Sequence, residues 1–125
     1  MSFLINLKFL RKGGDQMWPE TKTVYTALLP VKPVGNYKGF WLLVSVVEEI
    51  LKQNNICYNL TRDIYPVVAQ KFDCNSGTIE RNIRTLLLNM DMSALERFTG
   101  ANIPENITVS QVVDILVIYF FDNFE

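Results

Sequence analysis

The sequence predicts an all-α fold: a single small domain of about five to six helices that contains a helix-turn-helix. Three observations support this prediction. Apolar residues recur at helical spacing in several segments, no segment alternates apolar and polar residues as a strand would, and a polar turn at residues 73–76 separates two short helical segments. The chain has 125 residues, of which 49% are apolar and 20% charged, so it can bury one core.

The start of the chain has two interpretations. Residues 1–16 are either a translated leader or a flexible extension. One natural back-translation of residues 12–17 contains a bacterial ribosome-binding site followed by a start codon, so Met17 is the expected true start. The alternative is an amphipathic extension with a flexible joint at Gly13-Gly14.

Residues 17–37 are expected to be an irregular lead-in, with a short helix near residues 21–29, because they contain three prolines. The helical domain is expected at residues 38–125 and begins with a helix at 39–54. Glu48 and Glu49 are adjacent and therefore diverge on this helix, so we expect them on a solvated face. Its buried stripe is predicted to contain Phe40, Leu43, Val44, Val47, Ile50 and Leu51, widened by Trp41, Leu42 and Val46.

A helix-turn-helix is predicted at residues 66–85. Residues 60–72 have a helical pattern, but proline fits best in the first turn of a helix, so Pro66 predicts a restart near Tyr65. The turn at 73–76 is followed by a second helix at 76–90, with Asn75 or Ser76 as its N-cap.

The second helix of the motif is amphipathic. At roughly 100° per residue, its core side is predicted to carry Ile79, Ile83, Leu86, Leu87 and Met90. Its outer side is predicted to carry Thr78, Arg81, Arg84 and Thr85, with Glu80 at the flank. Leu88 also points outward, although a core pattern does not require it.

Two further helices are predicted after the motif. Ser93-Ala94-Leu95-Glu96 matches a capping box for a short helix that ends at Gly100. Thr108 or Ser110 is expected to cap a last helix that runs through Phe120.

The charge distribution leaves two interpretations open. The net charge is −1, whereas residues 1–39 carry +4 and residues 91–125 carry −5. The protein either meets an anion on one side only, or has an uneven surface charge with no partner attached to it.

Several classes of function are disfavoured by the residue types. The chain has no histidine, and its two cysteines lack CxxC spacing, so we expect no metal and no cofactor. Without a histidine base or a glycine-rich phosphate loop, we do not expect an enzyme. Two cysteines cannot staple this domain, so a reduced cytoplasmic location is favoured. The longest apolar run, residues 115–121, is far below the ~20 residues of a membrane span.

The outer side of the second helix is the candidate site. Arginine can donate two hydrogen bonds to guanine, so Arg81 and Arg84 are candidate base readers, and Glu80 can accept from cytosine. Near phosphates we expect Lys71, Thr78 and Ser76. The alternative is a solvated helix face on which Glu80 and Arg84 form an i, i+4 salt bridge.

Residues 38–90 resemble the C-terminal DNA-binding effector domain of the stage-zero sporulation response regulator family (sporulation initiation factor, C-terminal domain) of endospore-forming Firmicutes. The resemblance is carried by Tyr65-Pro66, Ala69, Lys71-Phe72 and Ile79-Glu80-Arg81-x-Ile83-Arg84. It implies a six-helix all-α domain that binds double-stranded DNA at sporulation control boxes, as tandem head-to-tail copies. It also implies that Glu80, Arg81 and Arg84 read the groove.

The chain departs from the family pattern at four positions of the motif helix. Thr78 replaces an arginine, Thr85 replaces a histidine, Gly77 replaces a serine and Leu88 replaces an acid, so two potential DNA contacts are changed. The receiver domain that precedes this effector in the family is not expected, because residues 1–37 are too few to form one.

Two functions follow as hypotheses. The first is a sequence-specific DNA-binding transcription regulator that acts as a homodimer or as tandem copies on DNA. The second is a degenerate paralogue, a protein-interaction module that modulates a full-length related regulator without strong DNA binding. The intact Glu-Arg-x-Ile-Arg sequence favours the first, and the net charge with Thr78 and Thr85 favours the second.

Overall fold

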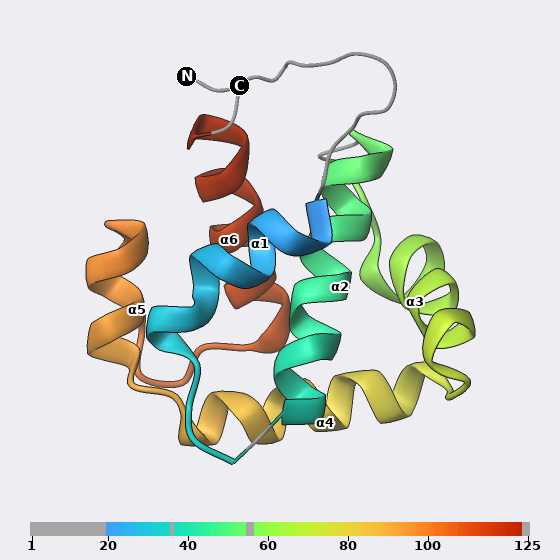
Figure 1. Cartoon of the computed structure of the whole chain (residues 1–125), viewed down its shortest axis with the longest axis horizontal. Coiled ribbons are helices and arrows are strands. Elements are labelled where there is room, and N and C mark those ends of the chain that lie inside the picture. Colours follow the sequence, from blue (N-terminus) through green and yellow to red (C-terminus); the bar gives the residue numbers. More distant parts are fainter. Residues whose placement is uncertain (1–19, 36, 55–56, 124–125) are drawn as a thin grey trace.

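The computed structural model describes residues 20–35, 37–54 and 57–123, and the regular structure within them is all helical, with no strand (Figure 1). A 3-10 turn, η1 Leu29–Val31, extends the first helix, and a π-helical turn, η2 Leu60–Ile64, precedes the third. The predicted all-α fold is confirmed. Its α-helices are α1 Glu20–Leu28, α2 Tyr37–Gln53, α3 Tyr65–Phe72, α4 Ser76–Asn89, α5 Met92–Thr99 and α6 Val109–Asn123.

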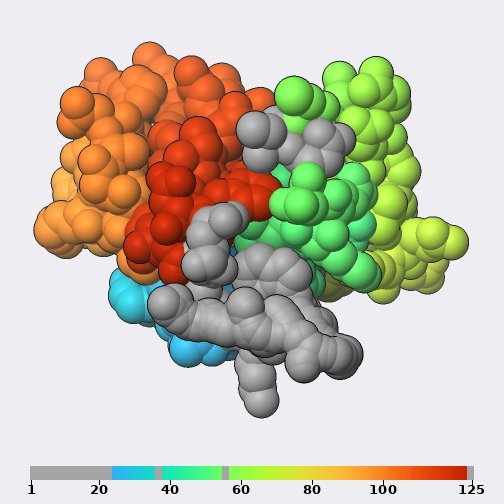
Figure 2. All heavy atoms as spheres, turned by 90° about the horizontal axis from the view of Figure 1, so that it is seen from above, coloured from blue at the N-terminus to red at the C-terminus, as the bar shows by residue number. Residues whose placement is uncertain are grey.

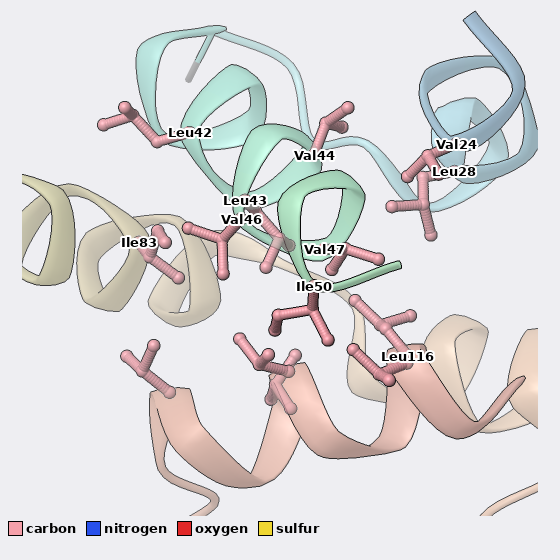
Figure 3. Close-up of a cluster of buried hydrophobic side chains, with 14 of the residues drawn as sticks. Val24, Leu28, Leu42, Leu43, Val44, Val46, Val47, Ile50, Ile83 and Leu116 are labelled. Atoms are coloured by element: carbon pink, nitrogen blue, oxygen red, sulfur yellow. The ribbon is translucent and has the colours of Figure 1, made fainter. Parts of the chain in front are cut away.

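Helix α2 is the centre of the fold and contacts α1, α3, α4 and α6 (Figure 1). Its predicted apolar stripe is buried except for Trp41, which is 37% exposed at the edge of the core, so the prediction is wrong for that residue. Figure 3 shows the side chains of α2 meeting those of the surrounding helices, with Val46 of α2 on the side of Ile83 of α4 and Ile50 of α2 on the side of Leu116 of α6. Burying this much apolar surface against four neighbours is the main favourable contribution to folding.

The acidic pair of α2 is buried, so the prediction of a solvated face for Glu48 and Glu49 is wrong. Both residues are only 6% exposed. A helix enclosed by four others has no broad solvated side, which periodicity within α2 alone does not reveal. Glu49 also meets polar partners from α2 and α3, and charged residues are rarely buried without such partners.

Residues 20–31, which belong to the segment expected to be irregular, form α1 and η1. The short helix expected near residues 21–29 corresponds to α1. Val24 and Leu28 are buried in the core, and the ring of Tyr25 stacks on Trp41 of α2 with centroids 4.3 Å apart. Pro30 lies at the start of η1, where a missing N–H is tolerated.

Helix α3 begins where proline predicts a restart. The side chain of Asn59 caps η2 by accepting from the N–H of Arg62 at 2.9 Å. The π-helical turn ends at Ile64, and α3 starts at Tyr65 with Pro66 in its first turn. Proline has no N–H to donate, and none is needed at that position. The predicted restart near Tyr65 is therefore confirmed.

Helix α5 begins at a cap that differs from the predicted one. Oδ1 of Asp91 accepts from the N–H groups of Ser93 and Ala94 at 3.0 and 3.3 Å, so Ser93 lies inside the helix. The predicted capping box is wrong because Asp91 already satisfies the N–H groups of the first turn. Glu96 instead accepts from the N–H of Ile103 at 2.8 Å, which ties the following loop to α5.

The end of α5 and the start of α6 follow the sequence signals. Gly100 closes α5 in the left-handed conformation, with φ of 76°. Thr108 caps α6: its Oγ1 accepts from the N–H of Gln111 at 3.1 Å, and Oε1 of Gln111 accepts from the N–H of Thr108 at 2.9 Å. This reciprocal pair is a capping box, and it selects Thr108 over Ser110.

The two ends of the molecule carry different elements. Figure 2 shows α6 and the C-terminal part of α2 in the middle, with α5 on one side and α3 on the other, as in Figure 1. Helix α3 therefore lies on the opposite side of the molecule from α5, and α4 runs along the lower edge in Figure 1. Among the residues that the structure describes, no helix is long and apolar enough to cross a membrane.

Candidate nucleic-acid interface

A tight turn sets the angle between α3 and α4. Asp73 ends α3 in the left-handed conformation, with φ of 53°, which aspartate tolerates better than most residues. The N–H of Cys74 donates to the carbonyl of Ala69 at 3.0 Å and closes the turn. Asn75 is the N-cap of α4, and its Oδ1 accepts from the N–H of Thr78 at 2.8 Å. One of the two predicted caps, Asn75, is thereby confirmed.

The inner side of α4 holds the motif against the core. Ile79, Ile83 and Leu86 are fully buried, as the helical spacing predicts. From α3, Val68 and Ala69 are buried as well, and small Ala69 allows a close approach between helices. This packing fixes which side of α4 faces outward.

The outer side of α4 presents a continuous exposed stripe. Arg81, Arg84, Thr85 and Leu88 are all exposed, at the i, i+3, i+4 and i+7 positions of one helix face. The predicted outward orientation of Leu88 is confirmed, and its side chain is 82% exposed. The stripe thus combines two cations, a hydroxyl and an apolar side chain on one accessible face of α4.

Glu80 and Arg84 form the i, i+4 ion pair, with Oε2 and Nη2 2.8 Å apart. Both side chains remain well exposed, so the pair contributes only a few tenths of a kcal/mol. Tyr65 of α3 lies near the pair. Its burial, and then the negative charge of Glu80, raise the pKa of Tyr65 to about 12. Each residue of such an exposed pair can exchange the other for a new partner at little cost in free energy.

The start of α4 is a small hydrogen-bonded cluster. Oγ1 of Thr78 contacts Oδ1 of Asn75 at 3.1 Å, and Nη2 of Arg81 donates to Oγ1 of Thr78 at 3.5 Å. Ser76, the first residue of α4, is half-buried beside this cluster. In contrast, Thr85 is exposed, and its carbonyl accepts from the side chain of Asn89 at 3.0 Å.

Lys71 extends toward α2. Its Nζ lies 3.5 Å from Oε1 of Glu49, and Oε2 of the same carboxylate accepts from Nε2 of Gln53 at 3.0 Å. Sequence reasoning selects Lys71 and misses Glu49. The two residues are 22 positions apart in the chain, and no spacing rule joins them.

The structure brings the predicted residues together in two groups. Ser76, Thr78 and Arg81 share the first turns of α4, and Glu80, Arg84 and Thr85 follow on the next turn. Lys71 belongs to neither group, because it is engaged with α2 behind the motif.

Comparison with known proteins gives one finding. Residues 24–119 match the family model described as "Sporulation initiation factor Spo0A C terminal". The match runs from α1 into α6 and so extends well beyond residues 38–90, where the motifs quoted above lie. No curated protein and no solved structure matches the chain.

Proposed function

Since the chain belongs to the family of C-terminal domains of sporulation initiation factor Spo0A, which are DNA-binding effector domains of transcription regulators rather than enzymes, we propose that it is a sequence-specific DNA-binding regulator. In this proposal α4 reads the major groove. The observation that carries it is the exposed stripe of α4, which displays Arg81 and Arg84 on a helix whose opposite side is locked into the core.

The two arginines are proposed to read bases. The major groove is about 12 Å wide and admits an α-helix, and arginine donates to O6 and N7 of guanine. Arg84 would exchange its exposed bond to Glu80 for a bond to a base. Glu80 could then accept from N4 of cytosine, so that the two residues together recognise both bases of a G·C pair.

Phosphate contacts are proposed for residues around the turn. In a helix-turn-helix the first helix crosses the backbone while the second enters the groove, which favours Lys71, Ser76 and Thr78 near phosphates. The N-terminus of α4 adds a partial positive charge toward the same strand. Thr85 is proposed to contact DNA beside Arg84, because it is exposed on the same face.

A salt titration tests the proposal. The full chain is titrated with a duplex that carries a sporulation control box and with a random duplex of equal length. Specific binding should exceed random binding, and log K should fall with log salt by about 0.9 for each phosphate contacted. Arg84→Ala should cost roughly 1–3 kcal/mol on the box duplex. Arg97→Ala on α5 is the matched control, since it removes another exposed arginine from outside the motif.

The second candidate function is a protein-interaction module that modulates a related full-length regulator. It is favoured by the ion pairs that engage two cations of the motif, Lys71 and Arg84. Equal and feeble binding to both duplexes, together with co-purification of a related regulator, would select this function instead. Binding as a homodimer or as tandem copies should appear as a steeper isotherm on a two-box duplex than on a one-box duplex.

A further inference from the structure

A polar network lies behind the helix-turn-helix, where α3 rests on α2 (Figure 1). At its centre is the carboxylate of Glu49. Oε1 faces Nζ of Lys71 at 3.5 Å, and Oε2 accepts from Gln53, whose Nε2 also lies 3.5 Å from the carbonyl of Asp63. The network therefore joins the centre of the fold to η2 and to the last turn of α3.

The two charges of this network are unequally exposed. The side chain of Glu49 is 8% exposed and that of Lys71 is 43% exposed. A carboxylate so enclosed is strongly disfavoured without a nearby cation, whereas a half-exposed ammonium keeps much of its hydration. Loss of the ion pair would consequently destabilise the charged form of Glu49 more than that of Lys71.

The cations of the motif differ in whether they form an ion pair and in how exposed that pair is. Among the described residues of the helix-turn-helix, Lys71 and Arg84 each form an ion pair with a carboxylate, and Arg81 forms none. The Glu80–Arg84 pair is open to water and to incoming ligands. The Glu49–Lys71 pair is closed on its acidic side, so a phosphate that approaches Lys71 meets a charge that is already neutralised.

We propose that Glu49 is an affinity-setting residue that acts through Lys71: its buried carboxylate neutralises the lysine and lowers the attraction of the motif for phosphates. The inference rests on the proposed function. It adds that Glu49 limits the electrostatic attraction between the motif and the phosphates of DNA. Glu49 makes no contact with DNA in this proposal. It acts only on the charge of Lys71, and its effect is visible in the salt dependence of binding.

The test compares two isosteric variants of neighbouring acids, Glu49→Gln and Glu48→Gln. Each removes one formal negative charge from a residue that is 6% exposed on α2, and Glu49 is the acid whose ion pair with Lys71 the structure shows. Binding to a random duplex is titrated with salt after urea unfolding has shown that each variant folds. Glu49→Gln should steepen the log–log slope by up to about 0.9, so the affinity lost between about 50 and 200 mM salt grows by a further factor of up to about 3.5.

Glu48→Gln should leave the slope close to that of the unmodified chain. Equal slopes for the two variants overturn the inference, because net charge alone would then explain the change. Weaker binding by Glu49→Gln also overturns it, since Glu49 would then hold Lys71 in a productive position.

Lys71→Gln provides a second measurement that does not depend on Glu49→Gln folding. With Lys71 already neutralised, its replacement alone should change the slope by much less than 0.9, and in the double variant it should abolish the effect of Glu49→Gln. A full loss of about 0.9 from Lys71→Gln alone refutes the inference.

The two proposals fail separately. The proposed function fails if the box duplex binds no better than the random duplex. The role of Glu49 is judged on the random duplex alone. If neither the unmodified chain nor Glu49→Gln binds any duplex, both proposals are overturned.

Discussion

The orientation of α4 can be tested with two identical substitutions on one helix. Leu86 is fully buried and Leu88 is 82% exposed, although they lie two positions apart. Replacing each by alanine removes the same atoms and changes helix propensity by the same small amount. Any difference between the two variants therefore reports on burial, and burial decides which side of α4 can face DNA.

The expected difference is large. Leu86→Ala leaves a cavity on the buried side of α4, which packs against α2, α3 and α6, and buried leucine-to-alanine changes cost about 2–5 kcal/mol. All three packing partners are helices that contribute buried residues to the core, so the site has little freedom to collapse, and we expect about 3 kcal/mol. Leu88→Ala should stay within about 0.5 kcal/mol of the unmodified chain. For a domain of this size, the buried change should lower Tm by more than about 10 °C.

The assay is urea unfolding of the full chain followed by circular dichroism at 222 nm, with all three proteins at one concentration. The midpoint should fall for Leu86→Ala and stay unchanged for Leu88→Ala, with similar m-values. Equal destabilisation by both changes would refute the described orientation of α4. The stripe with Arg81 and Arg84 would then not be the outer face.

Two further predictions concern the turn of the motif and the start of α3. Asn75→Ala should destabilise the protein by about 1 kcal/mol in the same assay, because Thr78 loses its side-chain acceptor, whereas Asn75→Asp should retain most of the stability; equal losses would contradict the capping role. Tyr65 has its pKa raised to about 12, compared with about 10 in an unfolded chain, so the associated stability is present below pH ~10 and is lost as the pH rises toward 12. Tyr65→Phe should flatten this part of the stability–pH curve, and an unchanged alkaline profile would count against the assignment.

Local signals in the sequence predicted much of the fold. Pro66 predicted the restart that begins α3, and Asn75 was one of two predicted caps for α4. The spacing of Ile79, Ile83 and Leu86 predicted the buried side of α4. These features depend on interactions within a few residues of one another, so propensity and periodicity are enough to find them.

The incorrect predictions share a different cause. Ser93 matches a capping pattern, but Asp91 is an equally good acceptor that lies two positions earlier in the chain. Glu48 and Glu49 fell outside the apolar stripe of α2, and periodicity assigned them to solvent. Their burial depends on how many helices surround α2, which is a property of the assembled fold.

In the candidate site, too, features set by local spacing were predictable and contacts between distant parts of the chain were not. Arg81, Arg84 and Thr85 were predicted on the outer face from the helical period, and the structure places them there. The partner of Lys71 was not predictable, because it comes from α2, 22 positions away.

The two acids that face the cations of the motif should behave differently on DNA. Glu80 and Arg84 are exposed, so water and salt already weaken their bond, and a guanine can replace the carboxylate at little cost. Glu49 is enclosed, so withdrawing Lys71 would leave a buried negative charge held by Gln53 alone. We therefore expect Arg84 to be available for bases, while the charge of Lys71 stays largely neutralised by Glu49 even beside a phosphate. Non-specific affinity comes mainly from phosphate neutralisation, and base contacts supply discrimination. A chain with net charge −1 can then bind DNA weakly overall and still distinguish its site from random sequence, because the contact that is held back carries no sequence information.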